Sequence, residues 1–239
     1  MTAARTIVGF DTATSRLTVA ATRDGEVLAE ASSDTAPGER PAHARELAGQ
    51  AEAAAETAGG WAAVDAIAVG VGPGSFTGLR IGVATARALG QGLGKPLAGV
   101  GSLAALSRGI RPDRDAGTAR LPVIDARRGQ AFAALYEASG AEVWEPFVAT
   151  PEELGARVAE LGESPIAAGD GSVRFRRQLE AAGADVLADD DEGHRISARH
   201  VCVLAAGARL SGPGGIEPIY LRPPDAELWR ERQRSERDR

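Results

Sequence analysis

The sequence predicts an α/β protein built from two successive halves that share a βββαβα plan. Short apolar runs of strand length alternate with helical segments, and the opening pattern of three strands, helix, strand and helix begins again after residue 102. In each half an aspartate ends the first strand: Asp11 and Asp125. We place the boundary near residues 101–120 and expect domains at 1–105 and 106–224, followed by a charged tail at 225–239.

The first half begins with three apolar runs that we interpret as antiparallel strands. An Asp24-Gly25 dipeptide separates the second run from the third, which is a strong hairpin signal. The helix that follows starts at Pro41, and its only large aliphatic residue is Leu47, so its apolar face is thin. The expected strands cover residues 7–10, 17–22, 27–32, 66–72 and 96–100, and the expected helices cover 41–58 and 79–92.

The second half repeats this order. A short helix and an Arg/Asp/Pro-rich loop come first, and the apolar runs then return with turn residues between them. A loop carrying the acidic run 189–192 precedes the last helix. The expected strands cover residues 121–125, 131–137, 142–149 and 165–169, and the expected helices cover 103–108, 151–161, 175–182 and 198–210.

Composition narrows the functional classes. The 239 residues carry a formal net charge of −6, which argues against a protein that wraps nucleic acid unaided, although a local basic patch remains compatible with it. The single cysteine, Cys202, cannot form an internal disulfide, and the N-terminal stretch resembles neither a signal peptide nor a membrane span. We therefore expect a cytoplasmic protein.

Two motifs could carry chemistry. The turn after Asp11 is rich in hydroxyl groups and could hold a metal-bound phosphate, or the aspartate could simply close the turn through its own backbone contacts. Its repetition at Asp125 favours an ancestral nucleotide cleft. The loop at residues 72–78, GPGSFTG, is equally compatible with an anion site at a helix start and with a tight turn between strand and helix. It is not a Walker loop, because no GK[ST] follows.

Catalytic and metal-ligating patterns are weak. His43 lies early in a helix, but Leu47 occupies the position where a second metal ligand would stand. The sequence contains no GxSxG elbow, and Cys202 lies in an apolar run typical of a buried thiol. We therefore predict neither a catalytic residue nor a metal site. The arginine-rich end of the chain fits a solvated helix, or a segment that contacts RNA or a partner.

Several strings resemble the TsaB (YeaZ) family. The most specific are GPGSFTGLRIGVATARALG at residues 72–90 and VIDARRGQAFAALYE at 123–137, and residues 8–20, 65–78 and 216–222 agree in the right order. The resemblance implies an actin-like or sugar-kinase-like ATPase fold with two ribonuclease-H-like halves. It also implies a non-catalytic partner of TsaD in the synthesis of threonylcarbamoyladenosine, a modified tRNA base beside the anticodon.

The resemblance further implies what the protein binds. The chain would pair with TsaD, or with itself when alone, and work with a TsaE-type P-loop ATPase, meeting tRNA only through the complex. ATP, magnesium and a metal would belong to the partner subunits, with at most a vestigial nucleotide cleft here at Asp11, Thr12 and Asp125. The alternative is an active phosphotransferase that uses Asp11 and Asp125. The pairing surface would lie on the helices at 41–58 and 79–92, with His43, Leu47, Leu79, Arg80, Gly82, Val83, Ala86, Arg87 and Gly90.

Overall fold

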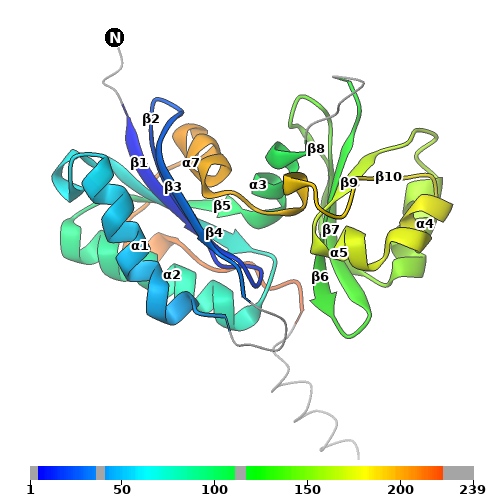
Figure 1. Ribbon diagram of the computed structural model, residues 1–239, viewed down its shortest axis with the longest axis horizontal. Coiled ribbons are helices and arrows are strands. Elements are labelled where there is room, and N and C mark those ends of the chain that lie inside the picture. The colour runs from blue at the N-terminus through cyan, green and yellow to red at the C-terminus, as the bar shows by residue number, and fades with distance from the viewer. Residues whose placement is uncertain (1–4, 36–40, 111–116, 223–239) are drawn as a thin grey trace, which may run out of the picture.

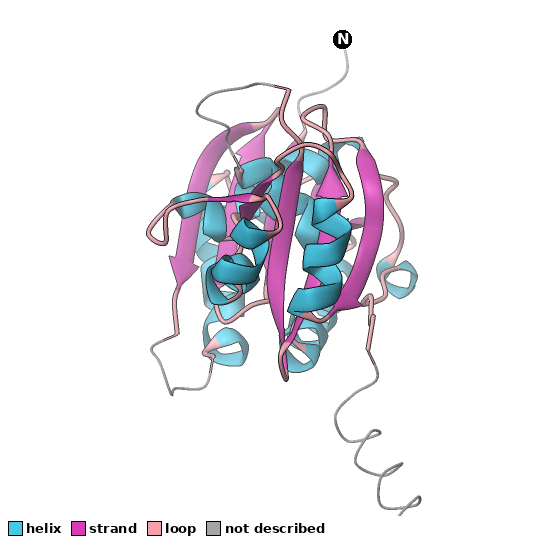
Figure 2. Ribbon diagram, turned by 90° about the vertical axis from the view of Figure 1, so that its right-hand side faces the viewer, coloured by secondary structure: helices cyan, strands magenta, loops and turns pink. Residues whose placement is uncertain are grey.

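The computed structural model describes residues 5–35, 41–110 and 117–222. The predicted charged tail at 225–239 lies outside the described residues. Figure 1 shows two halves side by side, each built on one sheet, and Figure 2 shows helices packed against the faces of the strands.

The two five-stranded sheets share one topology. In the first sheet the order is β3-β2-β1-β4-β5, and in the second it is β8-β7-β6-β9-β10 when traced from the corresponding edge. In both sheets the first three strands are antiparallel and the last two run parallel to the first, which confirms the duplicated α/β plan. The strands are β1 (Thr6–Asp11), β2 (Leu17–Arg23), β3 (Glu26–Ser33), β4 (Ala66–Gly72), β5 (Leu97–Gly101), β6 (Arg120–Arg127), β7 (Gln130–Tyr136), β8 (Glu142–Ala149), β9 (Ile166–Ala168) and β10 (Asp185–Val186).

The helices differ from the sequence prediction mainly at their ends. Helix α2 begins three residues earlier than expected because Ser75 caps it, accepting a hydrogen bond from the Gly78 amide. The helix expected at 175–182 is preceded by a separate turn, so α5 and α6 meet at Phe175. The helices are α1 (His43–Thr57), α2 (Phe76–Leu93), α3 (Ser102–Gly109), α4 (Pro151–Ala159), α5 (Asp170–Arg174), α6 (Arg176–Ala181) and α7 (Ala198–Gly207), with 3-10 turns η1 (Trp61–Ala63), η2 (Glu192–His194) and η3 (Pro213–Gly215). Among the described residues, no helix is both long enough and apolar enough to span a bilayer.

Helices α1 and α2 lie on the same face of the first sheet. The narrow apolar face of α1 packs against the first sheet, since Leu47, Ala51 and Ala55 are all buried. Helix α2 approaches the sheet closely enough that a Cβ at Gly82 would lie 2.4 Å from Thr12 Oγ1. Small residues on these helices therefore allow close packing of helix on sheet within the chain.

The core between the halves is built from α3 and α7. Helix α7 packs on β1 and β2 of the first sheet, although it follows the strands of the second, so the segment 106–224 contributes its last helix to the first half. Helix α3 contacts β6, and its Leu103 and Leu106 join Phe132 and Val201 in one buried cluster. Cys202 lies in the same cluster, and burial raises the pKa of its thiol to about 12. The thiol is therefore a packing group that stays protonated.

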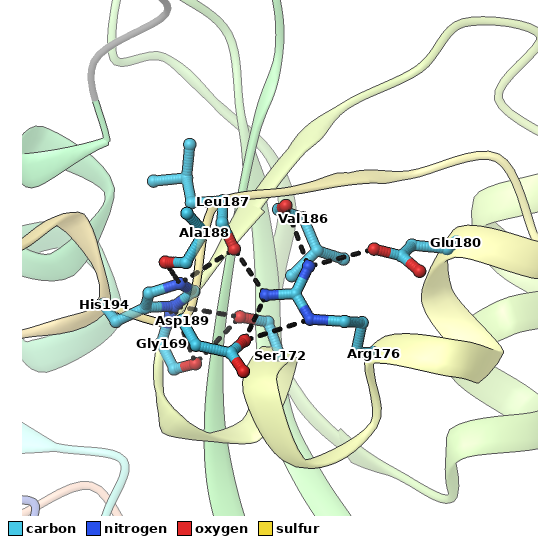
Figure 3. A network of polar contacts seen from close by, with 9 residues as sticks. All are labelled: Gly169, Ser172, Arg176, Glu180, Val186, Leu187, Ala188, Asp189 and His194. Carbon is cyan, nitrogen blue, oxygen red and sulfur yellow. Dashed lines mark hydrogen bonds and ion pairs between the residues drawn. The ribbon is translucent and has the colours of Figure 1, made fainter. Parts of the chain in front are cut away.

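A polar network fastens the acidic loop of the second half (Figure 3). Arg176 on α6 donates to Glu180 (2.9 Å) and to Asp189 Oδ1 (3.1 Å), as well as to backbone carbonyls of the loop. Beside it, His194 Nδ1 accepts from the Gly169 amide (3.1 Å) while Nε2 donates to the Ala188 carbonyl (2.9 Å). The run 189–192 is thus tied to α5 and α6, and both ring nitrogens of His194 are used inside the fold.

We expect Leu106→Ala to destabilise the whole protein. Leu106 is 1% exposed and lies in the cluster between the halves, so its truncation leaves a cavity there and should lower the unfolding free energy by about 2–5 kcal/mol. Urea unfolding followed by circular dichroism measures this. The matched change Val27→Ala, at a side chain 46% exposed on β3, should stay within about 0.5 kcal/mol of wild type. Equal effects of the two substitutions would contradict the assignment of this core.

Candidate functional site

A cleft of about 380 Å³ lies between the two halves. One wall is formed by the turn after β1 and the start of α2, and the other by the end of β6. The buried apolar residues Ile124 and Phe132 also line the cleft. The chain after η3 closes one side with Ile219, Tyr220, Leu221 and Arg222. Here the duplicated fold brings together the ends of β1 and β6, the first strands of the two sheets in chain order.

Asp11 lies beneath this cleft, among the buried polar groups. Its Oδ1 accepts from the Ala13 amide (2.7 Å), which is the turn-closing arrangement, and its Oδ2 accepts from Ser102 Oγ (2.6 Å). Burial raises the pKa of the Asp11 carboxyl, and these two hydrogen bonds offset only part of that effect. A Cβ at Gly70 would fall 1.8 Å from Oδ2, so the carboxyl fills the space that a side chain would need there.

Thr12 and His43 also serve the turn after β1. Thr12 is completely buried, and its hydroxyl donates to the Gly78 carbonyl (2.8 Å). His43 is 2% exposed, and its Nε2 donates to the Thr14 carbonyl (2.9 Å). Its Nδ1 is buried and has no hydrogen-bond partner among the described residues. Neither Thr12 nor His43 lines the cleft.

Asp125 does line the cleft, but its carboxylate is already engaged. Oδ2 accepts from Arg174 Nη1 (2.8 Å) and Arg127 Nη1 (3.3 Å), and Oδ1 accepts from the Arg127 amide (2.9 Å). The neighbouring Asp170 accepts from the Asp125 amide (2.9 Å). The structure thus separates the two sequence-predicted aspartates: Asp125 faces the cleft between arginines, and Asp11 is enclosed. Within the described residues, no group of three or more His, Cys, Asp or Glu side chains could hold a metal ion.

The loop at residues 72–78 is held against the turn after β1. The Ser75 amide donates to the Ala13 carbonyl (2.7 Å), so the start of α2 is positioned by the same turn that Asp11 closes. The Gly72 amide donates to Ser102 Oγ (3.2 Å). The loop is therefore a tight connection between β4 and α2 that also presents Gly74, Ser75 and Thr77 to the cleft.

Sequence reasoning missed the structural role of residues 216–222, which we call the strap. Arg87 on α2 donates through its guanidinium to the Ile216 carbonyl (Nε at 3.0 Å), and the Ile219 amide donates to the Val71 carbonyl (2.7 Å). At its far end, Arg222 Nη1 donates to Gln130 Oε1 of the second half (3.2 Å). The strap therefore runs from α2 to β7 across the cleft. In the sequence this segment stood out by the apolar and aromatic character of IEPIYLR and by its place among the strings that resemble the TsaB (YeaZ) family, but neither signal indicated the contacts across the cleft.

Most of the residues that we expected at the partner surface are instead buried within this chain. His43, Leu47, Leu79, Gly82, Val83, Ala86 and Gly90 are buried. Arg87 is half-buried and bonded to the strap, and Arg80 is exposed. The outer faces of α1 and α2 carry other small residues instead, and their pairing with a partner stays a proposal. The exposed positions include Ala44, Ala48, Gly49 and Ala53 on α1 and Ala84, Ala88 and Gly92 on α2.

We expect the enclosed Asp11 carboxyl to make stability depend on pH in an identifiable direction. Its pKa is raised in the folded protein above that of an unfolded aspartate, about 3.9, so above about pH 4 the native state binds more protons than the unfolded state. The ionised carboxyl then costs stability as pH rises. The unfolding free energy of wild type minus that of Asp11→Asn should fall from about pH 4 upward and level off above the raised pKa.

Urea unfolding at a series of pH values measures this difference. The exposed matched variant Asp190→Asn should show no comparable trend against wild type. A wild-type advantage over Asp11→Asn that grows with pH would contradict the enclosure of this carboxyl.

Comparison with known proteins connects this geometry to a family. The family model described as "TsaD: tRNA N6-adenosine threonylcarbamoyltransferase" matches residues 39–186. The chain is 32% identical over 225 residues to the tRNA threonylcarbamoyladenosine biosynthesis protein TsaB of Escherichia coli, covering 90% of this chain and 94% of that protein. A Bacillus subtilis protein of the same name is 42% identical over 71 residues, which is 30% of each chain.

Solved structures agree with these relatives. YeaZ from Pseudomonas aeruginosa superposes with a TM-score of 0.74 at 26% identity, covering 91% of this chain and all of that one. A ROK hexokinase from Thermus thermophilus superposes with a TM-score of 0.50 at 13% identity, covering 84% of this chain and 98% of that one, so it shares the fold alone. The two ribonuclease-H-like halves, the near full-length sequence match and the YeaZ superposition together show that this chain belongs to the TsaB (YeaZ) family.

Proposed function

We propose that this protein is a partner-binding subunit that supports the synthesis of threonylcarbamoyladenosine in tRNA and has no catalytic centre of its own. The observation that carries the proposal is the near full-length match to the E. coli protein named for that pathway. The partner is a TsaD-type protein, and a TsaE-type P-loop ATPase completes the assembly. The chain forms a homodimer when alone and works in the cytoplasm.

The state of the carboxylates supports a non-catalytic role. Asp11 is enclosed by Ser102 and Ala13, and Asp125 is held by two arginines. A phosphotransferase would need these oxygens free to bind magnesium or to accept a proton from the attacking group. The geometry thus counts against the phosphotransferase alternative.

The face of α1 that carries His43 does not fit a metal site either. His43 uses Nε2 to hold the Thr14 carbonyl, and the buried Leu47 occupies the position one turn further on. An imidazole with a single buried nitrogen left and no second ligand on its helix face makes a poor metal site. We therefore assign the metal, ATP and magnesium to the partner subunits.

The outer faces of α1 and α2 are the surface we assign to the partner. The buried residues of these helices fix them to the sheet, while the exposed face bears alanine and glycine along both helices. Small side chains let a second pair of helices approach closely, and the exposed charged side chains of Arg45, Glu52 and Arg80 on these helices can orient it.

A reconstituted reaction tests the proposed function directly. With tRNA, ATP and the other components of the reaction present, omission of this protein should reduce the modified base to a small fraction of its normal amount. Accumulation of modified tRNA at the full rate without it would refute the proposal. Active-site changes in the TsaD-type subunit should abolish the same reaction, which keeps catalysis on the partner.

We expect Ala88→Arg to disrupt pairing without unfolding the chain. Ala88 is exposed on the outer face of α2, so a long cationic side chain there blocks close helix approach but leaves the packing on the sheet intact. Affinity for the TsaD-type partner, measured by calorimetry, should fall at least about thirtyfold. The matched variant Ala181→Arg, exposed at the end of α6, should bind as wild type does. Equal binding of the two variants would place the partner elsewhere.

A further inference from the structure

An aromatic pair with a cation beside it stands at the mouth of the cleft. The ring centroids of Phe76 and Tyr220 are 4.9 Å apart with an interplanar angle of 37°, and the Arg80 guanidinium carbon lies 5.3 Å from the Phe76 centroid. Tyr220 is 43% exposed although it lines the cleft. A large aromatic side chain that is held in place yet exposed offers one face for stacking.

The backbone that carries Tyr220 is fixed on both sides. The preceding residue, Ile219, donates its amide to the Val71 carbonyl (2.7 Å), and Arg222 reaches Gln130 of the second half (3.2 Å). The Tyr220 ring is therefore held in position before a ligand binds, and stacking on it costs little conformational entropy.

The opposite wall of the cleft presents cations. The Arg127 side chain is 70% exposed and the Arg174 side chain is 47% exposed, and both contact Asp125. Arg127 and Arg128 occupy the left-handed region, with φ of 64° and 53°, which costs non-glycine residues energy. The hairpin thus holds an arginine toward the cleft at a position where glycine or asparagine would be less strained. Arg127 and Arg222 line the cleft together with Asp125 and Asp170. Two more arginines lie next to lining residues, Arg80 beside Phe76 and Arg174 on Asp125.

We propose that this mouth is a direct contact site for single-stranded RNA, with an unpaired base stacked on Tyr220 and flanking phosphates bound by Arg80 and Arg127. The inference rests on the proposed function, which supplies an RNA substrate, and goes beyond it, because the subunit then touches RNA itself. Cations placed around an exposed aromatic face match the alternation of phosphate and base in an unpaired strand. Tyrosine and arginine are also enriched at protein interfaces, so affinity for the TsaD-type protein has to be measured alongside RNA binding.

Fluorescence anisotropy with the full-length chain, alone and paired with its TsaD-type partner, tests this site. The probes are a labelled RNA hairpin with an unpaired loop and a fully paired RNA of the same length. Tyr220→Ala should weaken binding of the hairpin about tenfold, and Tyr220→Phe, which keeps the ring, should bind as wild type does. Arg127→Ala should lower the slope of log K against log salt by about one, whereas Arg177→Ala, exposed on α6 outside the cleft, should leave it unchanged.

Three results would overturn the inference. The first is binding of the hairpin that does not depend on Tyr220, and the second is equal binding of the hairpin and the paired RNA. The third is a Tyr220→Ala defect confined to affinity for the TsaD-type protein, which would make this mouth a protein-binding surface. Circular dichroism and urea unfolding establish that each variant is folded. RNA binding that does not depend on Tyr220, with normal pairing and modification, refutes only this inference, whereas full modification without this chain refutes the proposed function.

Discussion

The enclosed Asp11 carboxylate is the constraint on which the surrounding structure depends. An ionisable group removed from water needs hydrogen-bond donors, and the fold supplies them from the turn after β1 and from the start of α3. The Ser102 hydroxyl that donates to Asp11 also accepts from the Gly72 amide at the end of β4, so three elements meet at one carboxyl. Gly70 is confined to its residue type by the same group, because any side chain would occupy the position of Oδ2.

The consequences of this buried group extend to the cleft. Asp11 fixes the turn after β1 by accepting a hydrogen bond from the Ala13 amide. The Ala13 carbonyl in turn accepts from the Ser75 amide, and the Ser75 side chain caps α2. In the second half the corresponding Asp125 is bonded to two exposed arginines instead of being enclosed. Duplication of the fold has therefore left one leading-strand aspartate as a structural anchor and the other as part of a charged wall. In this structure each oxygen of the two carboxylates accepts at least one hydrogen bond.

Local sequence patterns were sufficient to predict β1 to β9, because the apolar runs and turn residues that define each strand lie within a few positions of one another. They could not reveal β10, which has only two residues, or the packing of α7 on the first sheet, which depends on contacts far away in the chain. The sequence did offer the turn-closing role of Asp11, which the Ala13 contact confirms, but it could not reveal the enclosure of the carboxyl, since its partner Ser102 is 91 residues away. The family resemblance assigned Gly82, Ala86 and Gly90 of α2 to a partner surface, and in the structure all three are buried. A stripe of small residues fits a sheet as well as a partner helix, however, and here that face packs on the sheet.

Helix α2 connects the features to which we assign function. Its inner face packs on the sheet, its start lines the cleft, and Arg87 on its flank holds the strap that carries Tyr220. The outer face of the same helix is the surface assigned to the partner. The helix spans 18 residues and is capped by Ser75 at its start and by the left-handed Gly94 at its end. The surface that we assign to the partner, the Phe76 side of the cleft mouth and the contact that holds the strap therefore all lie on one helix.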